Sequence, residues 1–303
     1  MISQQTLSGR AWAEMLLLAA FWGASFLAFA ICLQELGVFT TVAHRVFWGT
    51  LLMWLIAIIR KWPLPPPQLW IACLVMGLLN NVIPFSLIAW GQTTIESGLA
   101  AIFNASTAIF GIIFAAIVFS DERLTTRKTI GVILGFLGVS IAIGLESLRS
   151  FDLRSLAQLA ILGASISYGM ASVWARKTLK SLPPHTAALG MLTGASIIML
   201  PLAFIVDGRP SFDLQPETWA AIAYIAIFAT TLAYLLYYRV LAMAGSGNLM
   251  LVTLLIPPIA IVLGAIVLQE AIAITALIGF AFIALGMIIL DGRLAAKLSR
   301  SKI

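Results

Sequence analysis

Arg45 is the charged residue whose position most directly suggests chemistry. It lies seven residues into an apolar stretch over 38–59, which corresponds to roughly 10 Å of helix at about 1.5 Å per residue. An arginine at the centre of a membrane helix costs at least ~2.5 kcal/mol on insertion scales, so its burial needs a reason. Either the guanidinium faces a cavity, where it binds a substrate carboxylate or serves as a gate, or it snorkels to the lipid headgroups.

His44 and Trp48 accompany Arg45 on the same stretch. His44 titrates near neutrality and is therefore a candidate for proton sensitivity. Thr41, Arg45, Trp48 and Leu52 fall on one helical stripe, which is more polar than lipid would favour. We therefore take His44, Arg45 and Trp48 as candidate cavity residues.

Amide and hydroxyl side chains recur at the middle of two further stretches. Asn80 and Asn81 lie in the stretch over 68–90, and Asn104 and Ser106 in the one over 97–119. A polar group at that depth must find a partner, so it faces other helices or water. Hydrogen bonding between helices and contact with a substrate are both open for these residues.

Aromatic residues away from the membrane surface form another candidate group. Trp22, Trp48, Tyr168 and Tyr234 lie well inside their stretches, where an indole N–H or phenol O–H needs a partner. Trp22 and Ser25 share a helical face. These residues either pack helices tightly or stack against a flat or apolar substrate.

Three prolines are candidate hinges. Pro84 follows the amide pair, and Pro257 and Pro258 are adjacent in the stretch over 247–268. Two consecutive prolines remove two backbone donors, so we expect them to break the helix. Freed carbonyls at this depth are tolerated only against protein or a water-filled cavity.

Composition shows which elements must position these residues. Of the 303 residues, 61% are hydrophobic and 10% are charged, and the mean hydropathy is +1.05, far from the roughly 25% charged residues of a soluble domain. Soluble enzymes, disordered chains and nucleic-acid-binding domains are excluded, and the partner of most of the chain is the lipid bilayer. We predict an all-α integral membrane protein with ten transmembrane helices, over 11–31, 38–59, 68–90, 97–119, 129–145, 155–175, 186–206, 218–238, 247–268 and 272–290.

The Lys and Arg residues indicate an orientation. With the N-terminus in the cytoplasm, outer segments contain only Arg149, Arg154 and Arg209, and the other basic residues except Arg45 fall on the inner side. Both termini are then cytoplasmic, and 293–303 forms a basic cytoplasmic tail. The net charge of +6 is thus a topology signal and does not indicate nucleic acid.

The sequence also contains an internal repeat. A shift of 148 residues places 97–145 over 245–293 and aligns Glu122 with Glu270, Gly131 with Gly279, and Gly138 with Gly286. Each half, 11–145 and 155–292, has five predicted helices, and an odd number inverts the second half. Inverted repeats build secondary transporters with a central substrate site.

The repeated residues themselves have structural interpretations. The glycines, with Gly135, allow close helix packing, either between the fifth and tenth helices or with a second copy. Glu122 and Glu270 precede those helices, and we assign them to capping helix N-termini rather than to proton transfer.

These motifs resemble a known family. WGASF, HRVFW and the Glu-then-Gly-x6-Gly pattern in both halves resemble the EamA family of the drug/metabolite transporter superfamily, over essentially the whole chain. Within it, the sequence is most similar to the YddG-type exporters of aromatic and other hydrophobic amino acids. The resemblance implies a basket-shaped central cavity with the fifth and tenth helices outside it, and export from the cytoplasm.

We therefore predict a secondary transporter of the inner (plasma) membrane. Its expected cargo is a small amino acid or metabolite, with aromatic or hydrophobic amino acids favoured, moved by alternating access. An exporter of other metabolites, drugs or lipids, and a non-transporting membrane subunit, are the alternatives. No P-loop, metal cluster or Ser–His–acid motif is present, so neither an enzyme nor a cofactor is expected. Monomer and homodimer are both open.

Overall fold

The structure is a computed structural model that describes residues 9–120, 125–143, 153–237, 239–240, 243 and 252–291. In these ranges the regular structure is helical, with no strand. Glu122 and the predicted tail over 293–303 lie outside the described residues.

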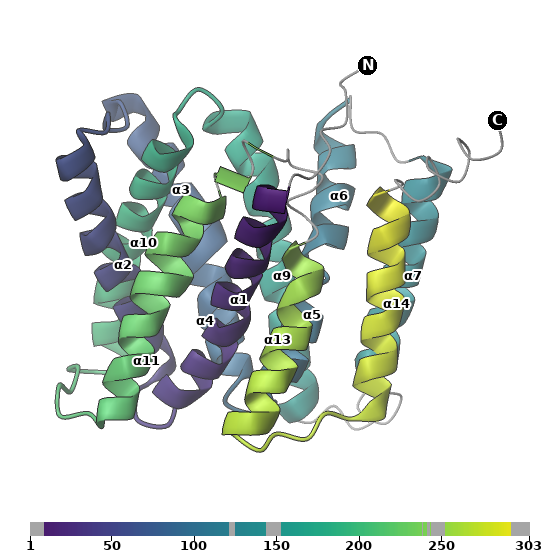
Figure 1. Ribbon diagram of the computed structural model, residues 1–303. Coiled ribbons are helices and arrows are strands. Elements are labelled where there is room, and N and C mark those ends of the chain that lie inside the picture. Colours follow the sequence, from purple (N-terminus) through teal and green to yellow (C-terminus); the bar gives the residue numbers. More distant parts are fainter. Residues whose placement is uncertain are drawn as a thin grey trace.

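Each of the ten predicted segments contains a described helix or a series of short ones (Figure 1). The first half consists of α1 (Gly9–Cys32), α2 (Val38–Arg60), η1 (Pro67–Leu69), α3 (Trp70–Gly77), η2 (Leu78–Val82), α4 (Ile83–Gly91), α5 (Ser97–Asn104), α6 (Thr107–Val118) and α7 (Thr126–Ile143). The second half consists of α9 (Leu153–Thr178), α10 (Pro184–Val206), α11 (Pro216–Ala226), η3 (Ile227–Leu232), α13 (Val252–Val267) and α14 (Ile274–Asp291).

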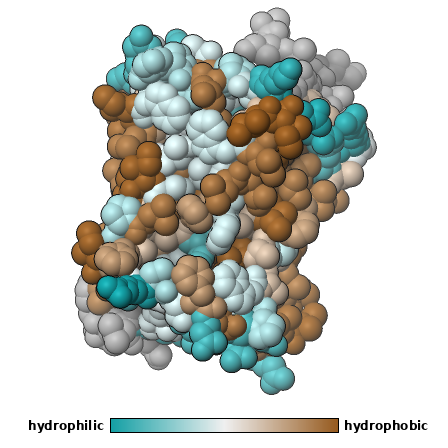
Figure 2. Space-filling view, turned by 90° about the vertical axis from the view of Figure 1, so that its left-hand side faces the viewer, coloured by the Kyte–Doolittle hydropathy of each residue, from teal (hydrophilic) through white to brown (hydrophobic). Residues whose placement is uncertain are grey.

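The outer surface suits a lipid environment. Among the described residues, 7 helical runs are long and apolar enough to cross a membrane, and Leu255–Val267 and Ile274–Ile289 are shorter apolar helices. Ile71 is 75% exposed and Ile205 is 78% exposed. Exposed apolar surface of this kind is unfavourable in water but not in lipid. Figure 2 shows apolar side chains over the middle of one face and hydrophilic ones toward its two ends. The prediction of an all-helical membrane protein is confirmed, whereas ten spans remain a prediction.

The two ends of the bundle differ in charge. We call the end where α1 begins and α14 ends the upper face, and the opposite end the lower face (Figure 1). Most described cations lie near the upper face, and most described carboxylates near the lower one. Arg154 and Arg209 are cations at the lower face, and Glu14 is a carboxylate near the upper face, where it pairs with Arg10 and Arg239. The upper cations are Arg10, Arg60, Lys61, Arg127, Lys128, Arg176, Lys177, Lys180 and Arg239, and the lower carboxylates are Glu35, Glu96, Asp207, Asp213, Glu217 and Glu270.

Helix pairing repeats between the halves. α1 packs along α13 in the same way that α9 packs along α6. α2 packs along α10 at the left-hand side of the bundle in Figure 1. α7 and α14 pair with each other at one side of the bundle (Figure 1). The first and second halves therefore supply equivalent helices to one central assembly.

Glycines set the separation of α7 and α14. A Cβ on Gly138 would lie 2.6 Å from the Gly279 carbonyl oxygen, and one on Gly279 would lie 2.5 Å from that of Gly138. About two turns further along, a Cβ on Gly286 would lie 2.6 Å from the Gly131 carbonyl oxygen. Only glycine allows backbones to approach this closely.

Two predicted helices differ in continuity from the expectation. The stretch over 97–119 is interrupted at residues 105–106, between α5 and α6, where the hydroxyls of Ser106 and Thr107 bond the carbonyls three residues before them. The predicted break at Pro257 and Pro258 is wrong, because both lie inside the continuous helix α13. Gly23 lets α1 lie directly against this helix, and that packing outweighs the two lost donors.

Candidate functional site

Arg45 lies inside the bundle and points to η3. Arg45 is only 5% exposed. Its Nε donates a hydrogen bond to the Thr230 hydroxyl at 3.2 Å. Its Nη2 donates to the Ala229 carbonyl oxygen, also at 3.2 Å. Within the described part of the chain, no carboxylate forms an ion pair with it. The guanidinium is therefore a buried cation that no described acidic side chain neutralises.

Two aromatic rings complete the surroundings of this cation. The guanidinium carbon lies 3.8 Å from the ring centre of Phe85 and 5.1 Å from that of Phe29. A cation over a ring face is attracted by the ring's quadrupole, more strongly when water is excluded. Tyr168 contacts the edge of Phe85, with ring centres 6.5 Å apart. The site thus joins one cation to a set of aromatic surfaces.

The partners of Arg45 depend on an unusual backbone. η2 and η3 are π-helical segments at equivalent places in the two halves. A π-helix bonds i to i+5, which leaves carbonyl oxygens free inside a span. Side chains from neighbouring helices use them: Arg45 bonds the Ala229 carbonyl, and the Ser167 hydroxyl bonds the Leu79 carbonyl at 2.6 Å.

Asn80 and Asn81 on η2 both form hydrogen bonds with Tyr234, which belongs to the other half of the chain. Their Nδ2 atoms donate to the Tyr234 hydroxyl at 3.0 and 3.1 Å. Asn81 is fully buried, yet its Oδ1 has no hydrogen-bond partner among the described residues. A buried amide oxygen without a donor costs free energy unless water or a ligand supplies one. We call Arg45, Asn80, Asn81, Thr230 and Tyr234 the central cluster.

His44 and Trp48 lie beside the central cluster and bond each other. The Trp48 indole N–H donates to His44 Nδ1 at 3.1 Å, and the imidazole meets the ring of Trp219 edge-on. His44 Nε2 and the Thr41 hydroxyl are buried without partners in the described chain. Unsatisfied polar atoms therefore continue along α2 toward the lower face.

Other predicted site residues have partners elsewhere. Trp22 packs against Tyr237 with ring centres 5.9 Å apart, so Trp22 and Tyr168 each contact a different ring. The Ser25 hydroxyl donates to the carbonyl of Trp22 at 2.6 Å, within its own helix.

The predicted residues near the α5–α6 interruption and the η2–α4 junction complete the set. The Ser106 hydroxyl donates to the Phe103 carbonyl at 2.6 Å, whereas Asn104 Oδ1 is buried without a described partner. Pro84 stands at the second residue of α4, directly after η2, inside the continuous helical run Pro67–Gly91.

Lower-face carboxylates connect separate helices. Glu35 accepts from the backbone N–H of Gln215 at 3.0 Å, and Asp207 from that of Thr40 at 2.7 Å. Each carboxylate satisfies a donor at the N-terminus of a different helix, α11 and α2 respectively. Hydrogen bonds of this kind hold the lower ends of the helices together.

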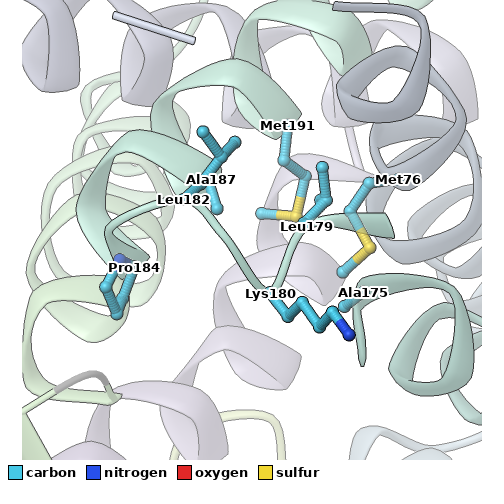
Figure 3. Close-up of a pocket in the computed structure, with 8 residues that line it drawn as sticks. All are labelled: Met76, Ala175, Leu179, Lys180, Leu182, Pro184, Ala187 and Met191. Carbon is cyan, nitrogen blue, oxygen red and sulfur yellow. The ribbon is translucent and has the colours of Figure 1, made fainter. Parts of the chain in front are cut away.

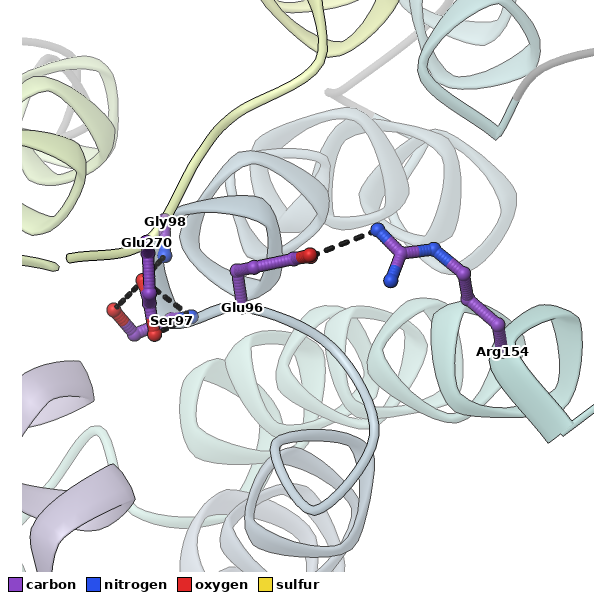
Figure 4. Close-up of polar contacts among 5 residues, drawn as sticks. All are labelled: Glu96, Ser97, Gly98, Arg154 and Glu270. Carbon is purple, nitrogen blue, oxygen red and sulfur yellow. Dashed lines mark hydrogen bonds and ion pairs between the residues drawn. The ribbon is translucent and has the colours of Figure 1, made fainter. Parts of the chain in front are cut away.

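Glu270 makes the most extensive of these contacts (Figure 4). It accepts from the Ser97 N–H at 2.9 Å, the Ser97 hydroxyl at 2.6 Å and the Gly98 N–H at 3.4 Å. It therefore caps α5, in the other half, rather than the helix that follows it. Gly264 leaves room for the carboxylate, because a Cβ there would collide with it. Beside it, Arg154 pairs with Glu96 at 2.8 Å.

Replacing Glu270 with alanine should destabilise the protein. The change leaves two backbone N–H groups and a hydroxyl at the start of α5 without an acceptor, and losing a cap typically costs about 0.5–2 kcal/mol. We expect a lower unfolding temperature in detergent. Glu217→Ala removes an exposed carboxylate from the first turn of α11 and should change it much less. Equal unfolding temperatures for the two variants would contradict the capping role.

Thr230, Phe29 and Phe85 are site residues that sequence reasoning missed. The one available signal was the pair Thr230–Thr231, which stands 150 residues after Asn80–Asn81. Thr230–Thr231 lies in η3, and Asn80–Asn81 lies in η2. The described residues contain no group of three or more His, Cys, Asp or Glu that could hold a metal ion.

Comparisons with known proteins agree with this architecture. The model of the EamA-like transporter family matches twice, over residues 10–144 and 155–290. The uncharacterized transporter YoaV of Bacillus subtilis is 21% identical, over 88% of this chain and 91% of its own length. An uncharacterized transporter of Archaeoglobus fulgidus is 25% identical, over 92% of this chain and 97% of its own length. Protein PagO of Salmonella typhimurium is 22% identical, over 81% of each.

A solved crystal structure has the same fold. It superposes with a TM-score of 0.66 over 93% of this chain and 96% of its own, at 17% identity. The two family matches cover both halves of the helical bundle and most of the chain. The chain therefore belongs to the EamA-like transporter family and is a multi-pass membrane transporter.

Proposed function

We propose that this transporter exports small amino acids or metabolites with an aromatic or hydrophobic side chain, by alternating access of its two halves. The observation that carries the proposal is Arg45, a buried cation without a described carboxylate partner that lies against Phe85 and Phe29. Such a site favours a ligand that combines a carboxylate with an apolar or flat group.

The amides of the central cluster suit the remainder of an amino acid. Asn81 Oδ1 is a buried acceptor with no described donor, so a cargo ammonium group can supply one. Asn104 Oδ1 is a further unpartnered acceptor, whereas His44 Nε2 carries the imidazole proton, because Nδ1 accepts from Trp48, and is an unpartnered donor. A cationic cargo is disfavoured, because Arg45 repels it and no described carboxylate offsets that repulsion.

The charge distribution supports a direction for the molecule in the membrane. Most described cations lie near the upper face, and positive residues favour the cytoplasmic side. We place the upper face, with both chain termini, in the cytoplasm, and we relate the two halves as inverted repeats. The lower face, with its connecting carboxylates, is then the closed outer end of an inward-facing state.

Counterflow in proteoliposomes tests the cargo. Vesicles loaded with unlabelled phenylalanine should accumulate labelled phenylalanine, and leucine and tyrosine should compete, whereas lysine should not. Protein-free liposomes are the control. If none of the hydrophobic amino acids exchanges above that control, the assignment of cargo is wrong.

A further inference from the structure

A cavity of about 220 Å³ lies at the upper face, away from Arg45. It is an open cavity lined by residues of α3, the end of α9, the loop after it and the start of α10. Its lining is apolar except for one cation, Lys180 (Figure 3). We call it the upper cavity, and its lining residues are Met76, Ala175, Leu179, Lys180, Leu182, Pro184, Ala187 and Met191.

The upper cavity adjoins the central cluster through one side chain. Met191 lines the cavity, and its sulfur accepts from Asn80 Nδ2 at 3.4 Å. Asn80 in turn bonds the Tyr234 hydroxyl at 3.0 Å. The thioether of Met191 therefore connects the cavity wall with the polar groups at the centre of the bundle.

The two methionines are the movable part of this wall. α3 and α10 are fixed against each other, because a Cβ on Gly77 would lie 2.5 Å from the Met191 carbonyl oxygen and one on Gly194 2.7 Å from Leu74 Cα. Methionine side chains have three rotatable bonds and adapt to irregular spaces. Met76 and Met191 can thus rearrange without separating these helices.

Charge and size define what the cavity accepts. Lys180 is exposed and forms no ion pair within the described chain, so it is available to an anion. The volume is below the roughly 300–1,000 Å³ of sites for drug-sized ligands. Apolar walls with one cation therefore suit a small molecule that carries one anionic group and an apolar portion.

We propose that the upper cavity is a loading site for such a small apolar anion or zwitterion, from which cargo passes Met76 and Met191 to the central cluster. Lys180 contacts the anionic group, and the apolar walls hold the side chain. The assignment rests on the proposed transport function for its role, whereas its chemistry can be tested independently of transport.

Thiol labelling tests the chemistry of the site. Ala187→Cys is made with Cys32→Ala and Cys73→Ala, which remove both native thiols. The probes are an anionic sulfonatoethyl and a cationic trimethylammonioethyl methanethiosulfonate. We expect the anionic reagent to react about fivefold or more faster, relative to a free thiol, because of the nearby ammonium group. Lys180→Gln should abolish this preference, and Lys177→Gln, outside the cavity, should preserve it.

Counterflow of phenylalanine after labelling tests the role. A sulfonatoethyl group on Ala187→Cys should block exchange, whereas the same group on Ser181→Cys, an exposed neighbour that does not line the cavity, should leave it intact. No anionic preference at Ala187→Cys overturns the site, and full exchange after complete labelling overturns its place on the path. If the unlabelled protein exchanges no phenylalanine, the proposed function fails, while the reagent preference still decides the site.

Discussion

Replacing Arg45 with methionine should reduce transport about tenfold or more while leaving the fold intact. Hydrogen bonds to charged groups contribute about 1.5–3 kcal/mol, and each 1.4 kcal/mol is about a factor of ten in affinity. A cargo carboxylate that loses this partner is therefore held far less well. Methionine keeps much of the volume against Phe29 and Phe85, and replacing an arginine that has no described ion-pair partner removes the desolvation cost of a buried charge.

The measurement pairs initial counterflow rates with unfolding temperatures in detergent. Arg45→Leu should behave like Arg45→Met, and Arg45→Lys should retain part of the exchange, because it keeps the charge but not the planar donor geometry. Normal exchange in Arg45→Met would exclude a role for the guanidinium in holding cargo. A large loss of unfolding temperature together with lost exchange would instead make Arg45 a structural residue that anchors α2 to η3.

Replacing Gly77 with alanine should destabilise the protein, whereas the same change at Gly111 should not. A Cβ on Gly77 would meet two backbone atoms of α10, the Met191 oxygen at 2.5 Å and the Ala195 nitrogen at 2.6 Å. Neither can rotate away, and overpacking of this kind typically costs about 1–3 kcal/mol. At Gly111 the nearest atom to such a Cβ is the Ser172 hydroxyl oxygen at 3.8 Å. The main effect there is the higher helix propensity of alanine, which stabilises a helix by up to ~1 kcal/mol relative to glycine.

The two alanine variants control for each other, because both add one methyl group to a glycine in a helix. Thermal unfolding in the same detergent should give a lower unfolding temperature for Gly77→Ala and one equal to or above that of the parent protein for Gly111→Ala. Gly77→Ala should also release α3 from α10 and so increase labelling of a thiol in the upper cavity. An unchanged unfolding temperature in Gly77→Ala would show that α3 and α10 are not held by this backbone contact.

The helices could be predicted from the sequence because lipid imposes a simple rule. A span needs about 20 apolar residues with its backbone bonded internally, and each predicted segment contains described helix. Whether a helix is continuous within its segment depends instead on local hydrogen bonds and on packing. Ser106 and Thr107 interrupt one helix through their own hydroxyls, whereas Pro257 and Pro258 do not interrupt α13 because α1 packs closely against it. The helix propensities of single residues do not include such tertiary packing.

The site could be predicted in part. Arg45, Asn81 and Tyr234 were identified because polar groups are costly at membrane depth. Their partners could not be, since the bonds of Arg45 to Ala229 and Thr230 span more than 180 residues of sequence and depend on the π-helical form of η3. The capping partner of Glu270 was missed for the same reason, because Ser97 lies in the other half of the chain.

The two π-helical segments bear on how related sequences should be aligned. A π-turn accommodates one residue more than an α-turn, and one residue turns an α-helix by about 100°. A relative without that residue needs a one-residue gap inside the stretch equivalent to Leu78–Val82 or Ile227–Leu232, at mid-membrane rather than in a loop. Gaps at these two places would identify transporters in which the carbonyls of Leu79 and Ala229 have no free counterpart, and in which a buried arginine must be held by other means.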